Sequence, residues 1–184
     1  MKIELFSTPL IIGNIDLNKF KLIAPELKNT WESNTLSTYG QENKMTKENY
    51  DYLMVTLASL LGQVIRGETT FKLQNIWEND YRENDFQENH IHTGSHFSFI
   101  IYVKGEKSNT VFFAPHKYLI ECFYKQNEFP YSYQSECRPG QIVLFPSYLE
   151  HMVLKNTGSI TYAGNIELTN YIDTKLHYNP NQEI

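Results

Sequence analysis

The pattern of apolar and polar positions divides the chain near residue 68, with helical periodicity before it and strand-like alternation after it. Residues 47–65 repeat apolar side chains at the i, i+3, i+4, i+7 spacing that gives a helix one apolar face. This predicts a helix lying against the outside of a sheet, with Thr46 as N-cap and Gly67 as its stop. Residues 3–15 favour one or two short strands, and Asp16 predicts the cap of a shorter helix running to about Leu27.

From residue 69 onward, short apolar runs separated by glycine and proline predict strands. The six candidate strands are Thr69–Trp77, His96–Val103, Thr110–Ala114, Gln141–Phe145, His151–Leu154 and Ser159–Leu168. A helical front followed by many short strands predicts an α+β, mainly β chain. We expect a double-stranded β-helix (a jelly roll or cupin-like barrel) with N-terminal helices packed on one sheet. One domain over 1–184 would then consist of a supporting strand and helices in 1–68 and a barrel core in 69–170.

The amino-acid composition is consistent with this fold and restricts the expected binding partners and cellular location. The 184 residues suffice for one well-buried core, and 13 Tyr and 11 Phe suit pleated sheets. A net charge of -5 argues against binding to nucleic acid or to an anionic membrane. The sequence has two cysteines, no secretory leader and no apolar run near the roughly 18 residues that a membrane span needs. We therefore expect a cytoplasmic protein with reduced thiols.

Histidines are concentrated in one short segment, 89–96, which holds three of the six. On an extended strand, residues i and i+2 share a face, so His90 and His92 can present their imidazoles side by side to one metal ion. A third ligand must come from elsewhere, and His151 opens a return strand after the Pro-Gly start at 139–140 and the break at Pro146. A His-x-His pair alone is often a plain surface or core feature. Together, the three histidines predict a metal site with open positions for catalysis, and no catalytic residue beyond the ligands.

With these residues in place, the stretch from about Gln74 to Asn165 resembles the 2-oxoglutarate/iron(II)-dependent oxygenases of the small phage and bacterial type. The matching residues are Trp77, Asn79, Asn89-His90-Ile91-His92, Ser98, Tyr102, Pro139-Gly140, Leu144-Phe145-Pro146-Ser147, His151 and Asn165. The wider superfamily holds iron on His-x-Asp…His, so the resemblance gives His90 the first place, His92 the place of the aspartate and His151 the last. It implies Fe(II) on these three residues and 2-oxoglutarate as co-substrate.

The co-substrate part of the resemblance has one departure. Superfamily members usually hold the distal carboxylate of 2-oxoglutarate with Arg-x-Ser, where this chain reads Ser159-Ile160-Thr161, and no arginine follows Arg138. The charge could come instead from Lys155, Lys104 or Arg138, with Tyr102, Thr161 and Asn165 completing the co-substrate contacts. Whether 2-oxoglutarate is used therefore stays open.

The remaining candidates are residues expected to contact the ligands or the substrate. Trp77, Asn79 and Tyr102 are expected to face the barrel interior, with core packing as the alternative. Ser98 is expected to contact the substrate or the ligands. His96 has several interpretations: a fourth ligand, a neighbour of the ligands, a substrate contact or a structural residue.

A second resemblance is to the cupins, whose second motif Gly-x5-Pro-x-Gly-x2-His is similar to Gly140, Pro146 and His151, with Tyr148 in place of the glycine. It implies the same fold and ligands but a dioxygenase that needs no 2-oxoglutarate. Three hypotheses follow: a 2-oxoglutarate-dependent hydroxylase, a three-histidine cupin-type dioxygenase, and a non-catalytic metal-binding jelly roll. For either enzyme we expect a small-molecule or peptide substrate, and a homodimer is one possible assembly.

Overall fold

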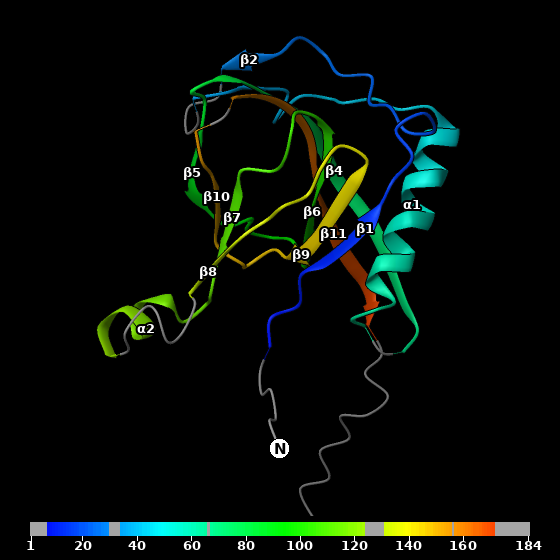
Figure 1. Cartoon of the computed structure of the whole chain (residues 1–184). Coiled ribbons are helices and arrows are strands. Elements are labelled where there is room, and N and C mark those ends of the chain that lie inside the picture. The colour runs from blue at the N-terminus through cyan, green and yellow to red at the C-terminus, as the bar shows by residue number, and fades with distance from the viewer. Residues whose placement is uncertain (1–6, 30–33, 66, 124–130, 156, 172–184) are drawn as a thin grey trace, which may run out of the picture.

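Two antiparallel sheets face each other in the computed structural model, which describes residues 7–29, 34–65, 67–123, 131–155 and 157–171 (Figure 1). In spatial order the larger sheet contains β1 (Ile11–Asn14), β9 (Gln141–Pro146), β6 (Phe97–Lys104), β11 (Thr157–Tyr171), β4 (Thr69–Glu83), β3 (Leu36–Ser37) and β2 (Lys28–Asn29). The smaller sheet contains β5 (Gln87–His90), β10 (His151–Val153), β7 (Thr110–Phe113) and β8 (Ser132–Gln134). The predicted double-stranded β-helix is confirmed.

Helix α1 (Lys47–Leu61) covers the outer face of the larger sheet (Figure 1). Its N-cap is Thr46, as predicted, and the Thr46 hydroxyl accepts a hydrogen bond from the backbone N–H of Asn49 at 3.2 Å. Its apolar face packs into the core cluster between helix and sheet, with Leu57 fully buried. The helix ends at Leu61 with Gly62 as its C-cap, short of the predicted Gly67.

The close approach of α1 to the sheet depends on a glycine in β1. A Cβ atom at Gly13 would lie 2.6 Å from the Cδ2 atom of Leu60, closer than real side-chain contacts allow. Gly13 therefore permits strand and helix to touch directly, which anchors β1 at the edge of the sheet.

The predicted helix from Asp16 to Leu27 is wrong, and α1 is the one helix among the described residues before Thr69. Asp16 caps only a single turn, accepting the backbone N–H of Asn18. Beyond it the chain extends, because the Ile23 N–H donates to the Lys44 carbonyl at 2.7 Å and the pair forms an isolated bridge. Phe20 and Leu22 are buried while Ile23 is exposed, an alternation typical of extended chain rather than helix.

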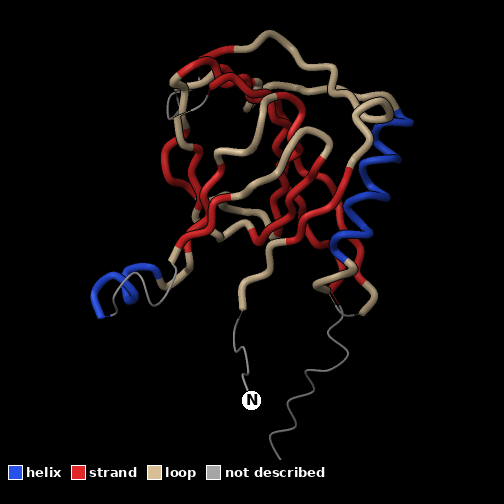
Figure 2. The backbone as a smooth tube through the Cα atoms, in the orientation of Figure 1, coloured by secondary structure: helices blue, strands red, loops and turns tan. Residues whose placement is uncertain are grey.

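The six predicted strands are all present with shifted ends, the largest change being β4, which continues to Glu83. The short strands β2, β3 and β8 were not predicted. Neither was helix α2 (Lys117–Phe123), which projects away from the barrel beside β8 (Figure 1). Figure 2 shows that both helices lie outside the layers of strands. Within the described residues, neither helix is long and apolar enough to cross a membrane.

A second apolar cluster fills the space between the two sheets and forms the surroundings of the candidate site. Its buried members are Trp77, Ile100, Tyr102, Phe112, Cys137, Val143, Phe145, Leu149 and Ala163. Both sheets contribute to this cluster, so the barrel interior is a packed core rather than an open channel.

Candidate metal centre

The three predicted ligands lie together on the inner side of the smaller sheet. His90 is the last residue of β5 and His151 the first of β10, and the two are paired directly across these strands. Their ring centroids are 4.3 Å apart, and that of His92 is 5.3 Å from His90 and 5.1 Å from His151. One ring nitrogen from each residue lies within 4.8 Å of the other two. These distances allow all three imidazoles to reach one metal ion.

His92 reaches the cluster differently from the predicted i, i+2 pair on one strand. Strand β5 ends at His90, and His92 lies in the following turn. Its backbone N–H donates to the carbonyl of Ser147 at 2.9 Å, which ties this turn to the segment preceding His151. Even so, the His90 and His92 rings are nearly parallel, at 18° to each other.

Each of the three rings has an oxygen acceptor for its Nδ1 atom. The carbonyl of Glu88 lies 2.7 Å from Nδ1 of His90, and that of Leu149 lies 3.0 Å from Nδ1 of His151. For His92 the acceptor is a side chain, Oδ1 of Asn165, at 2.6 Å. Carbonyl oxygens cannot donate, so each Nδ1 carries the proton and each Nε2 carries the lone pair, the arrangement that metal-binding histidines need.

A small polar network holds the Asn165 amide in place. The Ser98 hydroxyl donates to Oδ1 of Asn165 at 2.8 Å and lies 2.9 Å from Nδ1 of His92. The hydroxyl of Ser147 lies 2.8 Å from that of Ser98. Ser98, Ser147 and Asn165 are all buried, so the network lies within the core and orients the His92 ring from the side of the larger sheet.

His92 and His151 are neutral at physiological pH, as metal ligands must be. Burial lowers the pKa of His92 to about 4. Burial, with the two neighbouring imidazoles, also lowers the pKa of His151 well below its ordinary value. Imidazole ligands suit iron, zinc, copper or nickel, so the donor set fits the predicted metal.

A narrow cavity, with a volume of about 30 Å³ open to a water-sized molecule, extends from the three histidines between the sheets. Trp77, Asn79, Tyr102 and Thr161 line it, as predicted from the sequence. The ring centroid of Trp77 is 5.6 Å from that of His92. Tyr102 donates its hydroxyl hydrogen to Thr110 at 3.1 Å and accepts from Ser108 at 2.8 Å.

Other predicted residues lie elsewhere. Lys155 has an exposed side chain and is not part of the cavity wall, whereas Lys104 is. Arg138 is also exposed and does not line the cavity. Asn165 contacts His92 rather than the cavity, so the structure gives it a ligand-orienting position instead of a place in the co-substrate pocket.

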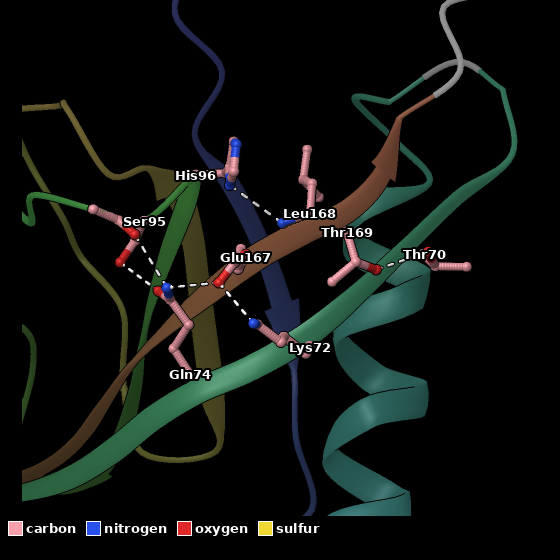
Figure 3. Close-up of polar contacts among 9 residues, drawn as sticks. Thr70, Lys72, Gln74, Ser95, His96, Glu167, Leu168 and Thr169 are labelled. Atoms are coloured by element: carbon pink, nitrogen blue, oxygen red, sulfur yellow. Dashed lines mark hydrogen bonds and ion pairs between the residues drawn. The ribbon is translucent and has the colours of Figure 1, made fainter.

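His96 lies outside the cluster and is not a fourth ligand. Its side chain is exposed, and its Nδ1 atom accepts the backbone N–H of Leu168 at 3.2 Å (Figure 3). Beside it, Gln74 donates to the Gly94 carbonyl at 3.0 Å and accepts from the Ser95 hydroxyl at 2.6 Å. These bonds fasten the turn that follows His92 to strand β4.

Several residues around the site could not be identified from the sequence. The carbonyls of Glu88 and Leu149 have positions that depend on backbone direction alone. Lys117 is buried and forms an ion pair with Glu150 at 2.5 Å, and Glu150 also accepts from Asn89. This chain of contacts links α2 to the residues immediately preceding His90 and His151.

The family that this sequence matches is consistent with a metal site at the three histidines. Residues 75–163 match the sequence model of the family described as "Putative 2OG-Fe(II) oxygenase". No curated protein matches the chain. The fold is similar to that of an oxidoreductase of the 2OG-Fe(II) oxygenase family from Burkholderia pseudomallei, at 9% identity and a TM-score of 0.53, covering 79% of this chain and 72% of that one.

Two further solved structures have the same fold. One is a prolyl-4-hydroxylase from Pseudomonas putida, at 15% identity and a TM-score of 0.51, covering 76% of this chain and 75% of that one. The other is HygX from Streptomyces hygroscopicus, with nickel, 2-oxoglutarate and hygromycin B bound, at 10% identity and a TM-score of 0.52, covering 89% and 84%. These low identities support the fold, while the family rests on the sequence match. The resemblance predicted from the sequence is confirmed by the match of residues 75–163 to the 2OG-Fe(II) oxygenase family.

Proposed function

We propose that the protein is an Fe(II)-dependent oxygenase that uses 2-oxoglutarate to hydroxylate a small-molecule or peptide substrate. The observation that carries this proposal is the set of three imidazoles, each with one ring nitrogen within 4.8 Å of the other two and each with an oxygen acceptor beside its Nδ1 atom. The family match of residues 75–163 supports the same reaction type.

In the proposed enzyme, His90, His92 and His151 hold the metal. When bound, iron and 2-oxoglutarate supply the oxygen chemistry and two of the electrons that it consumes. Three protein ligands leave coordination positions for co-substrate and oxygen. Replacing the usual aspartate with His92 removes one negative charge, so the site favours an anionic co-substrate more strongly than a two-histidine, one-carboxylate site does.

The chain's own part is to position groups and exclude water. Aromatic rings stand around the ligands: the centroids of Phe145 and Phe112 are 4.9 and 5.8 Å from that of His151. Their packing restricts the rings to one orientation and keeps bulk water from the inner side of the metal. In the cavity wall, burial raises the pKa of Tyr102, so its phenol stays protonated and serves as a hydrogen-bond donor.

The test is succinate formation by purified, iron-loaded protein after oxygen is admitted to an anaerobic mixture with 2-oxoglutarate and ascorbate, which supplies the two electrons that the unidentified substrate would otherwise give. We expect succinate from the wild-type protein and none from His151→Ala, with His96→Ala as the matched control that keeps activity. Iron bound with wild-type affinity but no succinate would contradict the proposal and favour the cupin-type dioxygenase. If His90→Ala and His151→Ala leave the affinity for Fe(II) unchanged, the histidines do not form the metal site at all.

A further inference from the structure

The cavity has no arginine at the place where the superfamily carries one. Ser159 and Thr161, on β11, line the cavity at that place, and both side chains are short and uncharged. No arginine lines this cavity among the residues that the structure describes. Arg82 points its guanidinium to Asp85 at 3.1 Å, so its charge is already paired. A dicarboxylate that enters this cavity must find its cation on another strand.

Strand β6, the neighbour of β11, supplies that cation. Lys104 lines the cavity and lies two residues beyond Tyr102, which also lines it. Side chains two residues apart on a strand point to the same face, so Lys104 lies on the same side of β6 as Tyr102. Tyr102 is buried, whereas Lys104 is exposed to solvent. Lys104 is also paired across the strands with Ile160, next to Ser159.

The two strands approach closely just after Lys104. A Cβ atom at Gly105, which has a φ of 122°, would lie 2.8 Å from the Cβ atom of Ser159. Both the positive φ and this contact require glycine at position 105. The backbone that follows Lys104 therefore lies directly against Ser159, the position where the superfamily carries its arginine.

The lysine charge is available to a ligand. Lys104 and Lys107, which also lines the cavity, have no carboxylate within 4.0 Å in the described part of the chain. By contrast Lys72 pairs with Glu167 at 3.0 Å, and Lys117 pairs with Glu150. Two unpaired ammonium groups in the wall of one cavity make a site for an anion.

The geometry points to Lys104, assisted by Lys107, as the residue that binds the distal carboxylate of the co-substrate, in place of the arginine of the superfamily. This inference rests on the proposed function, because it concerns the same cavity. The 2-oxo acid end of the co-substrate would face the three histidines, and the distal carboxylate would face the β6–β7 turn.

The test compares equilibrium binding of two acids to the protein loaded with Zn²⁺, which removes any contribution from turnover. The acids are 2-oxoglutarate and 2-oxobutyrate, which lacks the distal carboxylate. Titration calorimetry is carried out on the wild-type protein and on Lys104→Met, Lys104→Arg and Lys155→Met. Lys155 is the matched control, since it is an exposed lysine outside the cavity wall.

We expect Lys104→Met to weaken 2-oxoglutarate binding by roughly ten- to a hundred-fold, as for loss of a charge-assisted hydrogen bond. Its affinity for 2-oxobutyrate should not change, Lys104→Arg should restore most of the loss, and Lys155→Met should behave as wild type. An unchanged affinity of Lys104→Met for 2-oxoglutarate, or an equal loss for both acids, would overturn the assignment of Lys104. If instead the wild-type protein binds 2-oxoglutarate no better than 2-oxobutyrate, both the assignment and the use of 2-oxoglutarate in the proposed function fail.

Discussion

At the scale of single residues, Asn165 orients the one candidate ligand that lies beyond the end of its strand. Asn165→Leu keeps the side-chain size but removes the oxygen that accepts the Nδ1 proton of His92. We expect the affinity for Zn²⁺ to fall by roughly ten- to a hundred-fold, as for other partners of metal-bound histidines. Competition with a chromophoric chelator measures the affinity. Thr169→Val, on the same strand, is the control, and equal affinities for the two variants would mean that Asn165 does not position His92.

The same residues mark the limit of prediction from sequence at this scale. The three histidines were predictable because imidazole is a specific metal ligand, although the strand geometry expected for His92 was wrong, since β5 ends at His90. Asn165 and Ser98 were selected through the resemblance, but Asn165 was assigned to the co-substrate instead of His92. The acceptors for His90 and His151 are backbone carbonyls, which every residue carries, so no residue type could reveal them.

At the scale of elements, the ribbon formed by β4 and β11 holds the turn after His92. Gln74→Leu removes the bonds to Gly94 and Ser95, together with the bond that Gln74 donates to Glu167 (Figure 3). Because these bonds restrain the turn without touching the ligand, we expect a loss of Zn²⁺ affinity of about two- to ten-fold. Thr70→Val, which breaks the bond to Thr169 farther along the ribbon, should leave the affinity unchanged. A similar loss in both variants would assign the effect to the ribbon as a whole.

Helix α1 stabilises the fold through its apolar face and takes no part in the site. Leu57 is fully buried, so Leu57→Ala should lower the free energy of unfolding by about 2–5 kcal/mol through the cavity it leaves. Val55 is 70% exposed on the same helix, and Val55→Ala should change stability by less than about 0.5 kcal/mol. Urea denaturation monitored by circular dichroism measures both. Equal effects would contradict the packing of this face on the sheet.

Elements were predictable where local pattern and tertiary contact agree. Helix α1 has both a cap and a long apolar face, and its start was predicted correctly at Thr46. The helix expected after Asp16 is absent because a capping residue is only a local signal. The bridge that holds Ile23 in an extended conformation is made with Lys44, which is distant in the sequence. Strands β2 and β3 are two residues each, too short to leave any periodic pattern.

At the scale of the whole molecule, the fold class could be predicted from the sequence, whereas the order of the strands in each sheet could not. Strand β11 lies between β4 and β6, so residues near 160 pair with residues near 80 and near 104. Such pairings depend on the packing of the complete core, whereas the alternation of short strands and turns already indicates a jelly roll. The family match over 75–163 covers the barrel strands that carry the histidines, where the sequence pattern was most specific.

The site joins the two sheets, and this predicts how the metal affects the whole fold. His90 and His151 belong to the smaller sheet, whereas His92 is held by Asn165 and Ser98 of the larger sheet. A bound ion would therefore cross-link the sheets in the folded state only, and mass action gives about 2.7 kcal/mol of stabilisation at a hundred-fold excess over Kd. For a chain of this length we expect a rise in Tm of roughly 5–10 °C on adding Zn²⁺ or anaerobic Fe(II), reversed by a chelator.

Two histidine variants separate this effect from general metal binding at the surface. In His151→Ala one of the two ligands on the smaller sheet is lost, so the rise in Tm with metal should disappear at the same ion concentration. In His96→Ala the rise should be retained in full, because His96 is exposed and contacts the Leu168 backbone, not the cluster. The shift should also grow with the logarithm of the ion concentration above Kd, as expected for binding to the folded state alone. An equal shift in both variants would place the stabilising ion elsewhere and separate the histidine cluster from the stability of the barrel.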